Sequence, residues 1–157
     1  NEKNDGHSLR YYKTFSEPLQ QKLYSYVAKG QGAILCSGSY VASDMLEDKE
    51  IDFMHTIFHS SYSGTIRNSN YKVNGLQQEM YLINTINDKH YATNQSDVLK
   101  AEDSAFIAMQ YADGQTAAVA NNVGFHTFVM GFPFECINDR AMQATIMGGI
   151  LAFLITP

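Results

Sequence analysis

The apolar run Ala-Ile-Leu-Cys at residues 33–36 constrains the fold more than any other feature of this sequence. A short run of this kind is typical of a strand that is buried on both faces of a sheet. It follows a helical pattern from about Glu17 to Lys29, which begins after Ser16 and stops at Gly30. A helix, a glycine, an apolar strand and a loop of small residues form the second half of a right-handed crossover unit. The run therefore predicts an α/β fold with a parallel strand.

The remaining elements follow from periodicity and turn signals. Residues 43–60 are acidic at first and then amphipathic, which predicts a loop followed by a helix. Asn74-Gly75 and Asp113-Gly114 are strong hairpin signals. The apolar residues of the first helix share one face, as in a helix covered on one side: Leu19, Leu23, Tyr26 and Val27. The other predicted elements are strands at Gln78 to Thr85, Ala105 to Tyr111, Thr116 to Ala120 and Phe125 to Met130, the last three as an antiparallel meander, and a helix from about Asn138 to Phe153.

Composition excludes two classes of partner. The chain has 157 residues, 11 basic and 16 acidic side chains and a net charge of −5, so it lacks the basic stripe that nucleic-acid binding needs. No apolar run approaches the roughly 20 residues of a membrane-spanning helix. The length fits one domain. The chain begins at Asn1 without Met and without a signal-peptide core, so we expect a processed chain or part of a longer polypeptide.

Two segments carry a resemblance to a known family: residues 32–44, GAILCSGSYVASD, and residues 131–135, GFPFE. Together with the last helix they resemble the class I glutamine amidotransferase-like fold, in particular its divergent form in secreted Bacteroidetes proteins described as xanthan-lyase-like. The resemblance extends from Phe15 to Leu154. It implies a flavodoxin-like, partly parallel sheet with antiparallel strands in its carboxyl-terminal half, whose first strands precede Asn1. Residues 1–157 would then be one unit, the carboxyl-terminal part of a larger domain.

The resemblance also predicts which activity to exclude. Active amidotransferases of this family place a Cys on a strained elbow and a His and a Glu in a Phe-His-Pro-Glu sequence, because the thiol needs a base and the base needs an orienting acid. Glu135 matches the position of that acid, but no His is present beside it. Cys36 lies within the strand rather than at the elbow, and we interpret it as a buried structural residue. Amidotransferase activity is therefore not expected.

A hydrolase is the alternative hypothesis. Its nucleophile would be Ser37 or Ser39 at the elbow, with Glu135 nearby and a base from a segment that precedes this chain. His126 is a poor base, since a strand of about five residues would separate it from Glu135 by well over 10 Å. We interpret His126 as a surface or edge histidine.

Other polar and aromatic residues offer weaker signals. His55 and His59 share a helix face but lack the Glu that zinc hydrolases carry after the first His, so we expect no metal and no cofactor. The acidic run that begins at Asp44 lacks the ligand spacing of a calcium loop. Tyr40 and Asp44 remain candidate binding residues, and tyrosines 40, 62 and 71 could stack on sugars or pack across strands. Cys36 and Cys136 could form a disulfide only if their Cα atoms lie within about 7 Å.

These observations favour a non-amidotransferase accessory or binding module of a secreted, periplasmic or cell-surface protein. The polysaccharide-related role comes from the family label alone. The expected partners are polysaccharide and other domains of the same longer chain.

Overall fold

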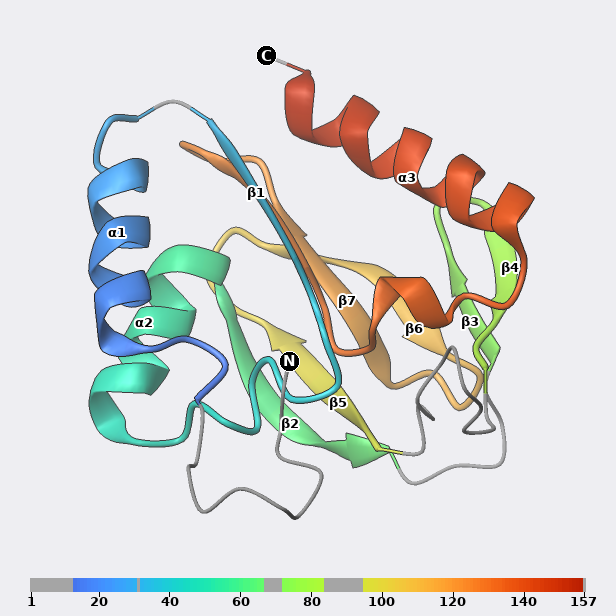
Figure 1. Ribbon diagram of the computed structural model, residues 1–157, viewed down its shortest axis with the longest axis horizontal. Helices are drawn as coiled ribbons and strands as arrows, with labels where there is room; N and C mark the ends of the chain where they lie inside the picture. Colours follow the sequence, from blue (N-terminus) through green and yellow to red (C-terminus); the bar gives the residue numbers. More distant parts are fainter. Residues whose placement is uncertain (1–12, 31, 67–71, 84–94, 157) are drawn as a thin grey trace.

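The computed structural model describes residues 13–156, except for residue 31 and the segments 67–71 and 84–94. Its elements form an α/β arrangement of a mixed sheet, a separate two-stranded sheet and three helices longer than one turn within the described residues (Figure 1). In chain order the elements are α1 (Glu17–Val27), β1 (Ala33–Ser37), α2 (Asp48–Phe58), β2 (Ser60–Ile66), β3 (Lys72–Gly75), β4 (Gln78–Tyr81), β5 (Ser96–Ala101), β6 (Phe106–Tyr111), β7 (Thr116–Asn121), β8 (His126–Met130), the short 3-10 helix η1 (Phe134–Cys136) and α3 (Arg140–Ile155).

The larger sheet has the strand order β1-β8-β7-β6-β3-β4. β1 pairs with β8 in parallel, with Ala33 opposite His126 and Ser37 opposite Met130. The other neighbours in this sheet are antiparallel, and β6, β7 and β8 form the predicted meander. β2 and β5 form the second sheet as an antiparallel pair. The parallel strand predicted at 33–36 is thus confirmed.

Two apolar clusters cover the two faces of the sheet, because alternate residues of a strand point to opposite faces. On one face Val129 packs with Phe53 and Phe58 of α2. On the other face Phe128 packs with Ile146 and Ile150 of α3. Figure 1 shows this layering, with α1 and α2 on one side of the β1–β8 region and α3 on the other. Among the described residues, no helix has the length and apolar character needed to cross a bilayer.

The last helix and one turn agree closely with the sequence. Asp139 caps α3 by accepting a hydrogen bond of 2.7 Å from the Met142 N–H. Four apolar residues follow one side of this helix: Ile146, Ile150 and Leu154 are buried, and Met142 is half-buried. The Asp113-Gly114 turn joins β6 to β7, and Gly114 has the positive φ of 85° that such a turn needs.

The first hairpin was predicted with the wrong turn. Asn74 and Gly75 lie within β3, and the turn between β3 and β4 consists of Leu76 and Gln77, with φ values of 51° and 60°. Gly75 serves close packing instead, since a Cβ there would lie 2.4 Å from Cγ of Met109. β4 also ends at Tyr81, so the predicted strand to Thr85 is too long; residues 84 and 85 lie outside the described part.

The burial of β1 and α1 differs from the prediction more than any other feature. All residues of β1 are half-buried, whereas a strand buried on both faces was predicted. No residue of α1 is buried, and its predicted inner residues Leu19 and Tyr26 are 40% and 39% exposed. The reason is topological: among the described residues β1 has a neighbouring strand on one side only. α1 packs mainly on α2, where Tyr24 meets Phe53 with ring centroids 5.6 Å apart.

Candidate functional site

The predicted site residues lie at the carboxyl edge of β1 and β8. Because the two strands are parallel, the loops that follow Ser37 and Met130 leave the sheet at the same edge. The Ser37 hydroxyl oxygen accepts a hydrogen bond of 3.3 Å from the backbone N–H of Phe134. Glu135 follows Phe134 and is exposed, while Ser39 is buried. The structure therefore brings the Ser37 loop and the Glu135 loop into contact, as the hydrolase hypothesis requires.

Neither His126 nor His59 is placed to serve this edge as a base. His126 lies opposite Ala33, at the other end of the strand pair, about 13 Å from Ser37 along β1. Its ring stacks on Phe153 of α3, with centroids 5.6 Å apart. His59 lies toward the same far end, since its ring centroid is 6.3 Å from that of Phe125. The geometry thus excludes a triad made of Ser37, His126 and Glu135.

The two cysteines do not supply a nucleophile either. Burial raises the pKa of the Cys36 thiol to about 12, so the thiolate that attacks carbonyl groups is scarce at neutral pH. Burial and the charge of Glu135 raise the pKa of Cys136 to about 11. The two residues form no disulfide with each other. The placement of Cys36 against the cluster around Phe53 agrees with the structural role expected for it.

Asp97 organises the site, although the sequence pattern did not single it out. Its side chain is fully buried, and Oδ2 accepts hydrogen bonds of 2.8 and 2.9 Å from the backbone N–H groups of Ala42 and Ser43. Its own N–H donates to the carbonyl of Gly131 at 2.8 Å. One residue of β5 therefore fixes both loops of the candidate site. The available signal was a single Asp at the start of an apolar strand, which is too common a pattern to single it out.

The glycine of the GFPFE motif has a packing role. A Cβ at Gly131 would lie 2.2 Å from the backbone carbonyl oxygen of Asp97, closer than real atoms approach. The same carbonyl accepts a hydrogen bond of 2.9 Å from the hydroxyl of Tyr111. Gly131 is thus explained by the close passage of β5, without any catalytic requirement.

Asp44 and Tyr40, the candidate binding residues, hold the segment that precedes α1. Asp44 Oδ2 accepts a hydrogen bond of 2.7 Å from the Thr14 N–H and lies 3.1 Å from the Thr14 hydroxyl. The Tyr40 carbonyl accepts a hydrogen bond of 3.2 Å from the Thr14 hydroxyl, and the Tyr40 hydroxyl donates to the Gln95 side chain at 3.3 Å. Lys13 makes ion pairs with Glu47 and with the buried carboxylate of Glu50. These contacts give both residues a structural role, and ligand binding by them stays a prediction; Tyr71 lies outside the described residues.

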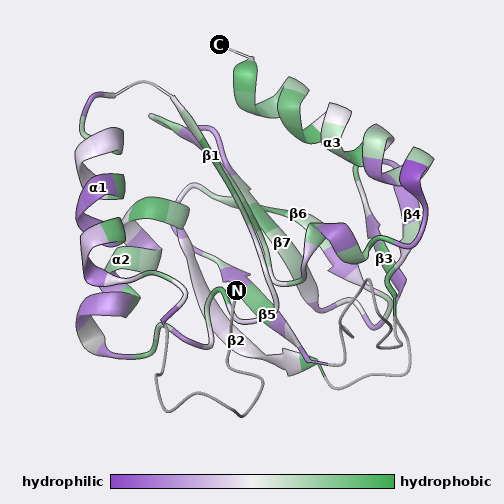
Figure 2. Cartoon of the chain, viewed as in Figure 1, coloured by the Kyte–Doolittle hydropathy of each residue, from purple (hydrophilic) through white to green (hydrophobic). Residues whose placement is uncertain are grey.

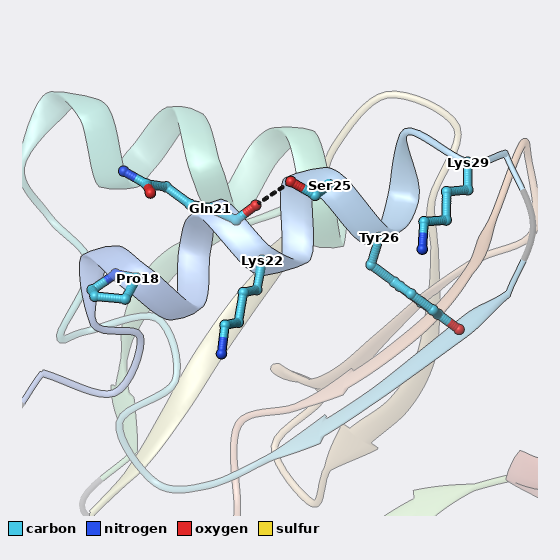
Figure 3. A pocket seen from close by; sticks show the side chains of 6 residues that line it. All are labelled: Pro18, Gln21, Lys22, Ser25, Tyr26 and Lys29. Carbon is cyan, nitrogen blue, oxygen red and sulfur yellow. Dashed lines mark hydrogen bonds between the residues drawn. The ribbon is translucent and has the colours of Figure 1, made fainter.

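A hollow of about 530 Å³ runs along one face of α1 (Figure 3). The Tyr26 side chain crosses it, and its hydroxyl accepts a hydrogen bond of 3.3 Å from the Ala33 N–H. The residues that line it are Pro18, Gln21, Lys22, Ser25, Tyr26 and Lys29. Elsewhere in the described chain, no three His, Cys, Asp or Glu side chains gather as metal ligands would.

Comparisons with known proteins show the fold and not the family. No protein-family model matches the chain, and no curated protein is significantly similar to it. Among solved structures, the chain is similar to the exo-beta-1,4-mannosidase Op5Man5 from Opitutaceae bacterium strain TAV5, with 13% identity and a TM-score of 0.59. The match covers 90% of this chain and 24% of the mannosidase chain. This chain thus spans about a quarter of that structural neighbour.

Proposed function

We propose that this chain is a non-catalytic accessory or binding module of a longer secreted, periplasmic or cell-surface protein with a role in polysaccharide metabolism. The observation that carries the non-catalytic part is the state of the elbow. The Ser37 hydroxyl accepts a hydrogen bond from the Phe134 N–H, His126 lies at the other end of the strand pair, and burial keeps the Cys36 pKa near 12. Neither His126 nor His59 can therefore supply a nucleophile at this edge with the base that its activation requires.

We further propose that the fold is the flavodoxin-like, amidotransferase-like one that the two sequence motifs resemble. Supporting this proposal, the motifs occupy the loops after two adjacent parallel strands. The polysaccharide role is supported by the family label and by the fact that a similar fold forms part of a mannosidase chain.

Polysaccharide binding is tested by affinity electrophoresis of the natural polypeptide through gels that contain acidic polysaccharides or β-mannan. We expect retardation in at least one gel and a weaker effect for Tyr40→Ala, because aromatic rings stack on sugars. Tyr81→Ala is the matched control, since Tyr81 is exposed on the distant strand β4. Mobility unchanged by every polysaccharide would reject the binding module.

A hydrolase remains the second candidate because Ser37 contacts the loop that carries Glu135. Such an enzyme would need a base from outside the described residues. Incubation of the natural polypeptide with fluorophosphonate and chloromethylketone probes distinguishes the two proposals. The accessory-module proposal predicts no covalent adduct by mass spectrometry, whereas an adduct that disappears in Ser37→Ala or Ser39→Ala would establish the hydrolase.

A further inference from the structure

The hollow along α1 is lined mostly by polar side chains that solvent reaches. Its volume of about 530 Å³ lies within the range of roughly 300–1,000 Å³ that ligand pockets occupy. Figure 2 shows the polarity of this helix, since hydrophilic residues recur along α1 whereas α3 is hydrophobic along most of its length. No residue of α1 is buried, so its side chains are accessible from solvent. A polar, hydrated ligand fits this surface better than an apolar one.

Two lysines give the α1 hollow a positive charge. Lys22 and Lys29 are exposed, and neither forms an ion pair with an acidic side chain of the described residues. Other lysines pair with glutamates: Lys13 with Glu47 and Glu50, Lys72 with Glu79, and Lys100 with Glu102. None of the described residues that line the hollow is acidic. The hollow is therefore a local positive surface on a chain with a net charge of −5, and it suits an anionic ligand.

The spacing of these residues places the two lysines and Tyr26 on one side of α1. Positions 22, 26 and 29 are four and three residues apart, which is the spacing of a single helix face. Figure 3 shows the three side chains extending to the same side of α1. At a rise of about 1.5 Å per residue, the Cα atoms of Lys22 and Lys29 lie about 10 Å apart along the helix axis. A ligand that reaches both charges is therefore longer than a single sugar ring.

The Tyr26 side chain is held in place before a ligand binds. Its hydroxyl accepts a hydrogen bond of 3.3 Å from the Ala33 N–H. Gly32 passes so close that a Cβ there would lie 2.2 Å from the Tyr26 hydroxyl oxygen. The residue is nevertheless 39% exposed. A ring that is already fixed loses little conformational entropy on binding, and its exposed part offers a platform on which a sugar ring can stack.

We propose that the α1 hollow binds an acidic polysaccharide, with a sugar ring on the Tyr26 side chain and sugar carboxylates on the ammonium groups of Lys22 and Lys29. Lysine ammonium groups act as point charges, so the hollow selects for negative charge rather than for one carboxylate geometry. The inference rests on the proposed function, because it names the class of polysaccharide and the surface that binds it. Tyr40 is not among the lining residues, so the two surfaces are tested separately.

Affinity electrophoresis of the natural polypeptide through polygalacturonate, alginate and fully methyl-esterified polygalacturonate tests the inference. We expect retardation by both polyuronates and none by the ester, which has the same backbone without the charges. Lys22→Gln combined with Lys29→Gln should weaken binding about tenfold, since each of two exposed ion pairs contributes a few-fold in affinity. Lys49→Gln combined with Lys100→Gln is the matched control, because both lysines are exposed outside the hollow and the net charge changes equally.

Two substitutions test the Tyr26 ring in the same gels. Tyr26→Ala should weaken binding, whereas Tyr26→Phe should bind as the wild type does, because stacking requires the ring and not the hydroxyl. Circular dichroism reports whether each variant is folded. An equal loss of binding in the folded Phe and Ala variants would contradict stacking on this ring.

The outcomes separate the inference from the proposed function. Retardation that the Lys22 and Lys29 substitutions leave unchanged, or retardation by β-mannan but not by the polyuronates, would overturn the inference and leave the binding module standing. Equal weakening by the control pair would mean that net charge alone drives binding, which also overturns it. Mobility unchanged by every polysaccharide would reject the binding module and the inference together.

Discussion

The two edges of the six-stranded sheet are built differently. β4, at one edge, is short and polar. The segment just before α3 covers part of its outer side, since the Asn138 N–H donates to the Tyr81 carbonyl at 2.8 Å. β1, at the other edge, is apolar on both faces and pairs in parallel. Natural edge strands are kept short, charged or covered, which discourages pairing with other chains. β4 follows this rule and β1 does not.

The difference lies in the kind of side chain that each edge leaves partly exposed. The apolar side chains of β1 are half-exposed, although they pack against the clusters under α2 and α3. At β4 the exposed groups are polar and paired, as in the ion pair of 2.5 Å between Lys72 and Glu79. We therefore interpret β4 as a true edge and β1 as an interior strand.

The largest expected effect comes from a lysine on each edge of the natural polypeptide. Leu35→Lys should lower the free energy of unfolding by about 3 kcal/mol or more, because a charge would enter an apolar site between the sheet and α3. Tyr81→Lys should leave it unchanged within error, since Tyr81 is 55% exposed. Urea denaturation measures both. Equal small effects would show that the two edges are equivalent.

Adding a methyl group at Gly131, in the loop that follows β8, should have the next largest effect on stability. Gly131→Ala should destabilise the protein by about 1–3 kcal/mol, because its Cβ would meet the Asp97 backbone. Gly148→Ala on α3 is the matched control: no atom lies within 4 Å of its Cβ position, so it should stabilise by about 0.5–1 kcal/mol. Thermal denaturation checks both signs, and a neutral Gly131→Ala would argue against the close passage of β5.

Much of the β1 side could be predicted from the sequence, because its signals are local. The apolar run and the glycine after α1 each act within a few residues, and they predicted β1 nearly as observed. The family resemblance placed Glu135 near the Ser37 elbow, and the structure brings their loops together because the parallel strands β1 and β8 end at one edge. β2, β3 and β5 were missed, since Gly64 and a bulge interrupt the alternation of β2 and the other strands are short or lack a clear period.

The incomplete burial of β1 could not be predicted from the pattern. A sequence shows which environment a strand suits, and it does not show whether the neighbours that make that environment are in the same segment of chain. Leu19 and Tyr26 illustrate this, because they have the spacing of a covered helix face and are about two-fifths exposed.

The contribution of the Glu79 ion pair on β4 to stability depends on pH. It should be smaller than the effect of Leu35→Lys or Gly131→Ala. The hydrogen bond from Lys72, followed by that from Tyr81, lowers the pKa of Glu79 below its ordinary value. A lowered folded-state pKa stabilises the fold above the unfolded-state pKa, and this contribution is lost as the pH falls through the folded-state value. The difference in Tm between the wild type and Glu79→Gln should therefore be present at neutral pH and vanish in acid. A constant difference would contradict the ion pair.

The last prediction concerns the reactivity of the Cys36 thiol, on the face of β1 that packs toward α2. With a thiol pKa near 12, Cys36 should react with iodoacetamide at pH 8 far more slowly than an unfolded cysteine. Peptide mapping of the native and urea-unfolded protein gives the ratio. Equal rates would mean that β1 opens to solvent as readily as a loose edge.

The most direct test is an experimental structure of the natural polypeptide in full, examined at the backbone N–H groups of Leu35 and Ser37. We predict that both donate to a strand that runs parallel to β1, while the Glu79 N–H on β4 has no strand partner. A structure in which the β1 edge faces solvent, or pairs with β1 of a second copy, would contradict the assignment of β1 as an interior strand.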